Sequence, residues 1–398
     1  MSLRQCPDID TYKALNTLNY FIMNYWTEVI FVAFAISALL TGIIIPQILL
    51  IAFRRKLFDD HDGRKIHKGI VPRLGGIAFF PSILCAVAFI TGWQLKFNFV
   101  PDLPDMFNPV VERTLLCLCS ITLLFLVGLA DDLVGVRYRG KFIIQIMCAF
   151  LTLVSGVGIY DLDGLFGIGP MTPVFSWVLT GFVVVYIINA VNLIDGIDGL
   201  ASGLSGMALM FYGWMFYHEG EYIYSTIAWA SFGTLLPFFY YNVFGNPQKR
   251  RKIFMGDTGS LTIGMIVTFL ALLLCDSPAP EEFCEYNTFL MAFAPLIIPV
   301  FDVCRVSLHR LRHHRSPFLP DRSHIHHKIL ALGLSSGKAL SVILGIQLFF
   351  TLSNVMLSPY VNINILVGAD ILIYVVGNIW LTRRIHRREK RLGCVLYE

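Results

Sequence analysis

Five aspartates stand beside strongly apolar runs of this sequence. Asp131 and Asp132 are adjacent and directly follow such a run, Asp195 and Asp198 are three residues apart, and Asp257 opens another run within a glycine-rich stretch. Adjacent carboxylates repel each other, so a cation or a proton must accompany them. Hard divalent cations prefer carboxylate and phosphate oxygens. We therefore predict an oxygen-ligated Mg²⁺ site, with Mn²⁺ as an alternative, that acts on an anionic phosphate substrate.

The segment 192–200, Asn-Leu-Ile-Asp-Gly-Ile-Asp-Gly-Leu, joins two of the apolar runs. If Asp195 and Asp198 lie in a helical first turn, their spacing puts both side chains on one face, and the glycines let a ligand approach the backbone. Ordinary helix capping explains one of these acids but not both together with the asparagine. Capping is also the structural alternative for Asp257 and for the pair 131–132.

Three histidines fall within four residues, at His324, His326 and His327. A zinc site is one interpretation, but cysteine partners are missing and the nearby acids favour a harder ion. Hydrogen bonding to phosphate is the better prediction. Arg322 and Lys68 are candidates for the same task.

The composition excludes an ordinary soluble domain. Hydrophobic residues make up 56% of the 398 residues and charged residues only 15%, whereas soluble proteins are roughly a quarter charged. A run of about 20 apolar residues spans a bilayer as a helix. We predict an all-α, polytopic membrane protein, one domain over residues 1–398, with about eleven spans: Thr27–Phe53, Leu74–Trp93, Arg113–Ala130, Phe142–Val157, Val174–Ala190, Ile197–Tyr217, Tyr222–Phe244, Ser260–Cys275, Thr288–Leu308, Ala339–Leu357 and Ile363–Leu381.

The basic residues predict the orientation. All but four of the 31 Lys and Arg residues, the exceptions being Arg4, Lys13, Lys96 and Arg113, fall on one side of these spans. Positively charged loops stay in the cytoplasm, so the N-terminus should lie outside and the C-terminus inside. The acids, glycines and histidines lie on the same cytoplasmic side. Lys141 and the run 249–252 suit an anionic substrate there, although the run is explained more simply by topology or by anionic lipid headgroups.

The order of these motifs resembles the polyprenyl-phosphate N-acetylhexosamine-1-phosphate transferases. The Asp pair 131–132, the Asn-x-x-Asp-Gly-x-Asp-Gly element at 192–199 and the Gly-Asp-x-Gly-Ser element at 256–260 each match a family pattern. Further similarities are Lys68-Gly69, Pro72, Gly75-Gly76 and Asn242. The family likeness covers most of the chain.

The histidine loop resembles one branch of that family. Ser-Pro-Phe at 316–318, Asp321-Arg322 and the His-Ile-His-His element at 324–327 are similar to enzymes that start O-antigen, enterobacterial common antigen or wall teichoic acid with UDP-N-acetylglucosamine. The phospho-N-acetylmuramoyl-pentapeptide transferase branch, which remains the alternative function, usually has three consecutive histidines. Here Ile325 interrupts them.

The resemblance implies a reaction in the bacterial inner membrane. Undecaprenyl phosphate attacks the β-phosphate of a UDP-N-acetylhexosamine and UMP leaves, either directly or through an aspartyl-phosphoryl intermediate. Asp257 would hold Mg²⁺ with help from Asp132, and Asp131 would act as base or orienting group. The remaining roles are implied as follows: Asp195 and Asp198 near the nucleotide or supporting the residues that bind it, Asn192 in substrate binding, Asn242 and Phe254 at the uracil, and Lys68, Lys141, Arg322, His324, His326 and His327 at phosphates. The resemblance also implies a homodimer, and no nucleic acid partner is expected.

An ion-coupled transporter is the alternative from another class, because it too carries acids in membrane helices. Transporter sites gather near the midplane in repeated halves, whereas these acids gather at one surface and no repeat is visible. Two further acids have no assigned role: Asp302, near Arg305, and Asp370, which has no basic neighbour in sequence. Cys275 and Cys284 share an outer loop and are candidates for a disulfide.

Overall fold

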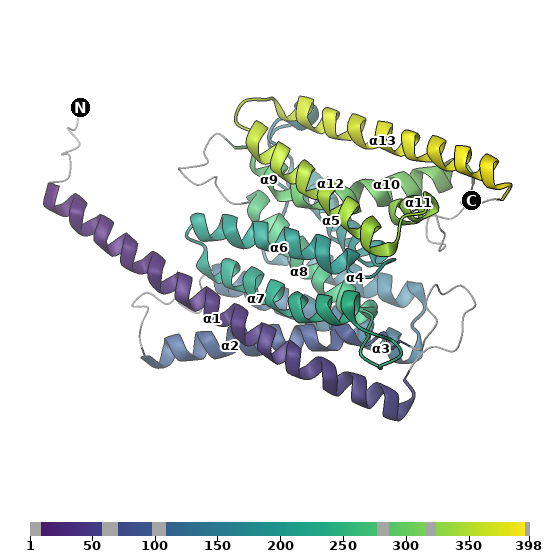
Figure 1. Cartoon of the computed structure of the whole chain (residues 1–398). Helices are drawn as coiled ribbons and strands as arrows, with labels where there is room; N and C mark the ends of the chain where they lie inside the picture. The colour runs from purple at the N-terminus through teal and green to yellow at the C-terminus, as the bar shows by residue number, and fades with distance from the viewer. Residues whose placement is uncertain (1–8, 58–70, 98–108, 277–285, 315–323, 395–398) are drawn as a thin grey trace.

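A computed structural model describes residues 9–57, 71–97, 109–276, 286–314 and 324–394. Its regular secondary structure is entirely helical within these ranges. Figure 1 shows the long helices running roughly parallel, with α1 and α13 on opposite sides of the bundle. The principal helices are α1 (Ile9–Arg55), α2 (Phe79–Phe97), α3 (Pro109–Val134), α4 (Tyr138–Val154), α5 (Pro173–Ile194), α6 (Leu200–His218), α7 (Tyr222–Phe239), α8 (Gly256–Asp276), α10 (Ile297–Arg312), α12 (Ser336–Leu357) and α13 (Ile363–Leu392).

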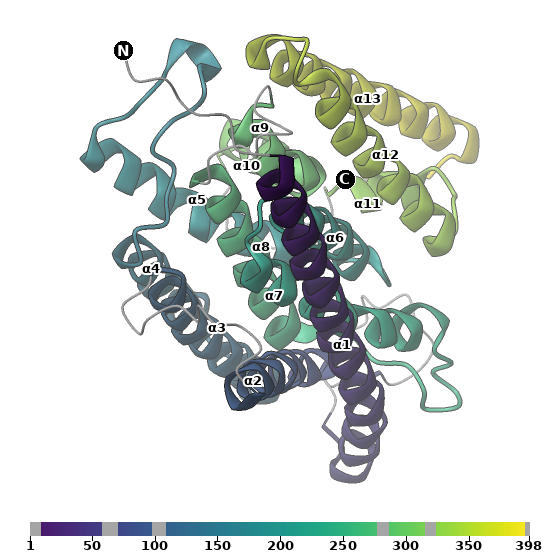
Figure 2. The ribbon, with the colours of Figure 1, turned by 90° about the vertical axis from the view of Figure 1, so that its left-hand side faces the viewer.

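Helix α8 forms the core of the bundle. It packs against α3, α5 and α6, and every residue from Thr258 to Leu274 is buried. Figure 2 shows it in the middle, with α3 and α4 on one side and α6, α12 and α13 on the other. The outer helices instead expose many large apolar side chains, which is the pattern of a lipid-facing surface. The buried position of α8 therefore fixes both of its ends within the protein.

Eight helices in the described residues are long and apolar enough to cross a membrane. They are Ile22–Arg55, Gly75–Phe97, Pro109–Val134, Pro173–Ile194, Gly256–Asp276, Thr288–Arg312, Ser336–Leu357 and Ile363–Leu392. This confirms a polytopic, all-α membrane protein. The other three predicted spans form α4, α6 and α7, which have 17 to 19 residues. The number eleven and the orientation of the termini stay predictions.

The ninth predicted span is not one continuous helix. It consists of α9 (Thr288–Phe293), a 3₁₀ turn at Ala294–Leu296 and α10. Pro295 lies in that turn, where its missing N–H removes one intrahelical hydrogen bond and favours the break. A short helix that the sequence did not predict, α11 (Ile325–Ala331), follows α10.

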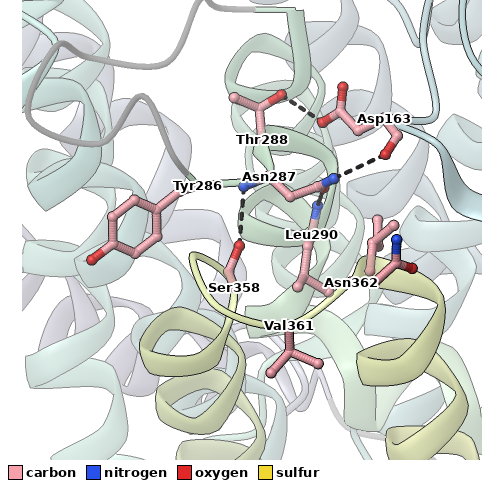
Figure 3. Close-up of a pocket in the computed structure, with 9 residues that line it drawn as sticks. Asp163, Tyr286, Asn287, Thr288, Leu290, Ser358, Val361 and Asn362 are labelled. Atoms are coloured by element: carbon pink, nitrogen blue, oxygen red, sulfur yellow. Dashed lines mark hydrogen bonds between the residues drawn. The ribbon is translucent and has the colours of Figure 1, made fainter.

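An open pocket of about 550 Å³ lies at the end of the molecule where α8 terminates at Asp276. Figure 3 shows Asp163, Thr288, Asn287 and Ser358 around it. Asp163 accepts hydrogen bonds from the Thr288 hydroxyl and the Phe289 amide, both 3.0 Å. The polar groups of this pocket thus secure the start of α9.

Candidate active site

The site is built around the N-terminus of α8. Gly256 adopts φ +73°, and a side chain there would collide with the Arg73 carbonyl and with Asp132. Gly128 of α3 lies directly against Thr258, so the two backbones approach closely. Four residues further along α3, Asp132 therefore reaches the exposed amides of α8.

Asp132 caps α8 from a different helix. Its carboxylate accepts hydrogen bonds from the amides of Asp257 and Thr258 at 2.8 and 2.9 Å, and from the Thr258 hydroxyl at 2.6 Å. The first amides of a helix lack partners within it and carry partial positive charge. Asp132 satisfies two of them, which fixes the position of Asp257. The sequence placed Asp132 after its helix, but α3 continues to Val134.

Asp131 and Asp257 share one lysine. The Lys141 ammonium lies 2.9 Å from Asp131 Oδ2 and 2.5 Å from Asp257 Oδ2, and Asp131 Oδ1 also accepts from the Val136 amide at 2.7 Å. Lys141 belongs to the first turn of α4, whereas the sequence placed it in a loop. The structure therefore brings together three residues that are up to 126 positions apart.

Asn192 joins this group from α5. Its amide donates to Asp257 Oδ1 at 3.2 Å and to the Ser260 hydroxyl at 2.8 Å. The sequence placed Asn192 in a loop, but it lies in the last turn of α5, which extends to Ile194. Four helices thus contribute a polar group to the same small region.

Asp195 and Asp198 do not lie in a helical first turn, so the condition under which both side chains would share one helix face is not met. Helix α6 begins at Leu200, its N-cap is Gly199 at φ +80°, and no side chain caps it. Capping by either aspartate is therefore wrong. The chain turns between α5 and α6 because glycines permit it, and the two carboxylates are carried on that turn.

The two turn carboxylates have different surroundings. Asp198 Oδ2 lies 2.6 Å from the ammonium of Lys252, which is buried. Asp195 is exposed, and partial desolvation together with the negative charges of Asp257 and Asp198 raises the pKa of its carboxyl above the usual value. The positive charge of Arg73 acts in the opposite direction.

Asn242 has a structural role. Its side-chain oxygen accepts from the Gly199 amide at 2.6 Å, and its amide donates to the Ile253 carbonyl at 2.8 Å. Asn242 is buried, so it ties the 195–199 turn to the segment before α8. Phe254, the other predicted uracil contact, is half-buried in that segment, and its backbone bonds to Pro72 and Gly75.

The histidines lie on α11 and at its start. His324 donates from Nδ1 to Asp302 at 2.8 Å. His326 is 1% exposed, and neither of its ring nitrogens has a hydrogen-bond partner among the described residues. Its ring lies against Gly196, where a Cβ would collide with it. Burial, followed by the charges of His327 and His324, lowers the pKa of His326 to about 3.

Some predicted residues cannot be placed, and others were not foreseen. Lys68, Arg322 and Cys284 lie outside the described residues, so their predicted roles stay predictions. Arg73, counted only as a topology signal, acts electrostatically on Asp195. Thr258 and Ser260 contribute hydroxyls, for which the match of 256–260 to a family pattern was the available signal.

The acidic group suits a hard cation. Asp131, Asp132 and Asp257 each offer an oxygen, and these three atoms lie within 4.8 Å of one another. Such oxygens are the ligands that Mg²⁺ prefers. An ammonium already lies between two of the carboxylates, so the position attracts positive charge. These residues could hold a divalent ion.

Fold and site together define a multi-pass, all-helical membrane protein with an acidic centre at one end of its core helix. The model of glycosyl transferase family 4 matches residues 114–275, which include the three clustered aspartates. The chain is 30% identical over 338 residues to the Bacillus subtilis (strain 168) protein named "Probable undecaprenyl-phosphate N-acetylglucosaminyl 1-phosphate transferase", covering 82% of this chain and 85% of that one.

Enterobacterial relatives are equally similar. The undecaprenyl-phosphate alpha-N-acetylglucosaminyl 1-phosphate transferase of Yersinia pestis is 30% identical over 86% of this chain and 90% of its own length. The protein of the same name from Escherichia coli (strain K12) is 29% identical over 77% and 80%. The chain belongs to glycosyl transferase family 4, and the predicted family resemblance is confirmed.

Proposed function

We propose that this protein transfers N-acetylglucosamine-1-phosphate from UDP-N-acetylglucosamine to undecaprenyl phosphate in the bacterial inner membrane and releases UMP. The observation that best supports this proposal is the convergence of Asp131, Asp132, Asp257 and Lys141 at the N-terminus of α8. The names of the relatives support the same acceptor and the same transferred group. A pentapeptide-carrying donor is not favoured by these names.

The reaction joins two anions. An oxygen of the lipid phosphate forms a new bond to the phosphorus that carries the sugar, and the bond from that phosphorus to the bridging oxygen of UMP breaks. Phosphoryl transfer of this kind needs alignment and charge neutralisation more than covalent help. An acidic centre with a bound cation and a nearby lysine meets this requirement, whereas carboxylates alone would repel both substrates.

We assign the centre of the site to Asp257. Asp257 would hold Mg²⁺, and Asp132 supports it by capping α8 and by offering a neighbouring oxygen. When bound, Mg²⁺ supplies positive charge at the diphosphate. Asp131 is oriented by the Val136 amide and by Lys141, which suits a group that orients the lipid phosphate or accepts its proton. Lys141 is placed to contact a phosphate oxygen.

The donor would lie beside the 195–199 turn, where α11 packs against it. Asp195 and Asp198 line the turn, and His326 faces it with both ring nitrogens unpartnered among the described residues. A buried polar group without a partner is costly, so a donor that hydrogen-bonds His326 would remove this penalty. Asn242 acts indirectly by holding Gly199 in place. Lys68 and Arg322 would add further phosphate contacts.

The proposed donor is cytosolic, so the site must face the cytoplasm. Cysteine substitutions in the loop after Asp276 should react with an impermeant label from outside the cell, and substitutions between Arg312 and Arg322 should not. The reverse pattern would place the site on the wrong side for UDP-sugars and would contradict the proposal.

The activity itself is tested with purified protein, Mg²⁺, undecaprenyl phosphate and UDP-N-acetylglucosamine. We expect release of UMP and formation of a lipid-linked N-acetylglucosamine diphosphate, detected by mass spectrometry, and loss of both when EDTA removes the metal. Turnover that persists in EDTA would refute the metal assignment. Absence of the lipid product would refute the function.

A further inference from the structure

Asp302 is the most heavily bonded carboxylate among the described residues outside the acidic centre. It is fully buried on α10. It accepts hydrogen bonds from Arg305 at 2.8 Å, from His324 Nδ1 at 2.8 Å, from the Ile325 amide at 3.0 Å and from the Tyr374 hydroxyl at 3.2 Å. These donors belong to α10, to the start of α11 and to α13, so one carboxylate joins three elements.

The bonds to His324 and Ile325 determine where α11 begins. The Ile325 amide belongs to the first residue of α11, where a helix leaves its amides without partners. Bonding through Nδ1 also sets the ring orientation of His324. Because α11 has only seven residues, it is too short to be stable alone. Its position therefore depends on such contacts.

The other side of α11 is fixed to α13. Lys328 donates to Thr382 at 3.1 Å and to Asn378 at 3.4 Å. With its first residue and Lys328 held, α11 directs His326 against Gly196 in the turn between α5 and α6. The His324 and His326 rings are stacked with centroids 5.8 Å apart. A continuous set of contacts thus runs from Asp302 through His324 to His326.

An ion pair with Arg305, its basic neighbour in the sequence, is the simplest explanation of Asp302. It is present, at one helical turn's separation. It does not account for the donors from α11 and α13, which an isolated i,i+3 pair would not require. Asp370 gives the contrast: it is also a buried acid in a predicted span, yet it accepts a hydrogen bond from the Asn354 amide of the adjacent α12, at 2.8 Å.

We infer that Asp302 is a positioning residue for the donor: it does not touch the substrate, but it holds His324 and α11 so that His326 faces the 195–199 turn. This inference rests on the proposed function. It predicts that loss of the Asp302 charge weakens donor binding and leaves the lipid acceptor and the acidic centre unaffected.

The first test compares Asp302→Asn with Asp370→Asn, two matched neutralisations of buried acids. Asp302→Asn should raise the KM for UDP-N-acetylglucosamine about tenfold or more, because hydrogen bonds to a charged group are lost. Its KM for undecaprenyl phosphate and its Mg²⁺ requirement should match wild type, and Asp302→Glu should recover part of the donor affinity. Asp370→Asn should behave as wild type. Equal donor KM in all variants would overturn the inference.

The second test asks whether Asp302 acts through α11. In the His326→Ala background, adding Asp302→Asn should raise the donor KM little further, because residues in one network are not additive. Full additivity would overturn the inference. If Asp302→Asn does not fold, Tyr374→Phe removes the hydrogen bond from the Tyr374 hydroxyl to Asp302 and should raise the donor KM about two- to threefold; an unchanged KM there would equally overturn the inference. Wild-type protein that fails to turn over the donor would instead refute the proposed function.

Discussion

The two ends of α8 carry the same residue type in different settings. Asp276, at one end, is paired with Arg113 at 3.1 Å. Beside it Asp163 is engaged by the Thr288 hydroxyl and the Phe289 amide (Figure 3). We call this the opposite face. The structural partners just named account for the charge or the hydrogen bonds of each of its two aspartates.

At the other end, which we call the carboxylate face, two of three clustered carboxylates share one lysine ammonium among the residues that the structure describes. Asp131 and Asp257 share the single ammonium of Lys141, and Asp132 lies within reach of both. Four helices are needed to bring these groups together, so the arrangement is not a by-product of one helix end. The comparison teaches that an aspartate at a helix terminus indicates chemistry only where several converge on too little positive charge.

The largest contrast is expected between Asp257→Asn and Asp276→Asn. Asp257→Asn keeps the shape of the side chain but removes the central anionic ligand, so UMP release should fall about 1,000-fold. Asp276→Asn changes the other end of the same helix and should retain near wild-type turnover. Steady-state UMP release, with thermal unfolding as a folding control, checks both. Comparable losses in the two variants would erase the distinction between the faces.

Lys141→Met should have the next largest effect. Turnover should fall about 100-fold, because a cation near the transferred phosphate is lost. The Mg²⁺ concentration for half-maximal activity should decrease at the same time, because the ammonium no longer competes for Asp131 and Asp257. A Mg²⁺ titration of variant and wild type measures this. A higher Mg²⁺ requirement in the variant would mean that Lys141 supports metal binding and does not compete with it.

Much of this arrangement could be predicted from the sequence, for a physical reason. Apolar runs of membrane length locate helices, and helix ends on the same side of a membrane place their polar residues on one face. The convergence of Asp131 with Asp257 followed from that logic. Boundaries did not, because polar residues at the end of an apolar run can continue the helix: α3 includes Asp132, and α13 continues through a basic stretch to Leu392.

The remaining features depend on contacts that have no local signal. The cap of α8 by Asp132 requires Gly128 to lie against Thr258, which no single motif encodes. The side-chain amide group of Asn242 bonds to backbone groups of two segments. This contact likewise forms only because segments that are distant in sequence meet. Helix α11 is seven residues long and depends on Asp302 and α13, so neither length nor periodicity predicted it.

The histidine segment, residues 324–327, should differ from both faces in how its contribution to folding stability depends on pH. Burial and the charges of His327 and His324, partly offset by Asp302, lower the pKa of His326 to about 3, with Arg305 adding to the decrease. The unfolded chain therefore binds the extra proton below pH 6.5, and stability declines as the pH falls from 6.5 toward 3. By pH 5 the loss from His326 should reach about 2 kcal/mol.

Thermal unfolding of wild type and His326→Gln between pH 7.5 and 5 measures this loss of stability. The variant should lose less stability on acidification, because glutamine does not titrate. Identical pH profiles would show that His326 is not buried in its neutral form.

The smallest effect is expected on the opposite face. Asp163→Ala removes the hydrogen bonds to Thr288 and Phe289 and places alanine at φ +50°, which costs more for alanine than for aspartate. The free energy of unfolding should decrease by about 1 to 2 kcal/mol, while both substrate KM values stay at wild type. A selective change in either KM would assign this face a part in the reaction.

The central claim is tested most directly by offering purified wild-type protein two donors side by side, each with undecaprenyl phosphate and Mg²⁺. We predict UMP release and lipid-linked product with UDP-N-acetylglucosamine, and neither with UDP-N-acetylmuramoyl-pentapeptide. Efficient transfer from the pentapeptide donor, or UMP release that is equal with and without the lipid acceptor, would contradict the account.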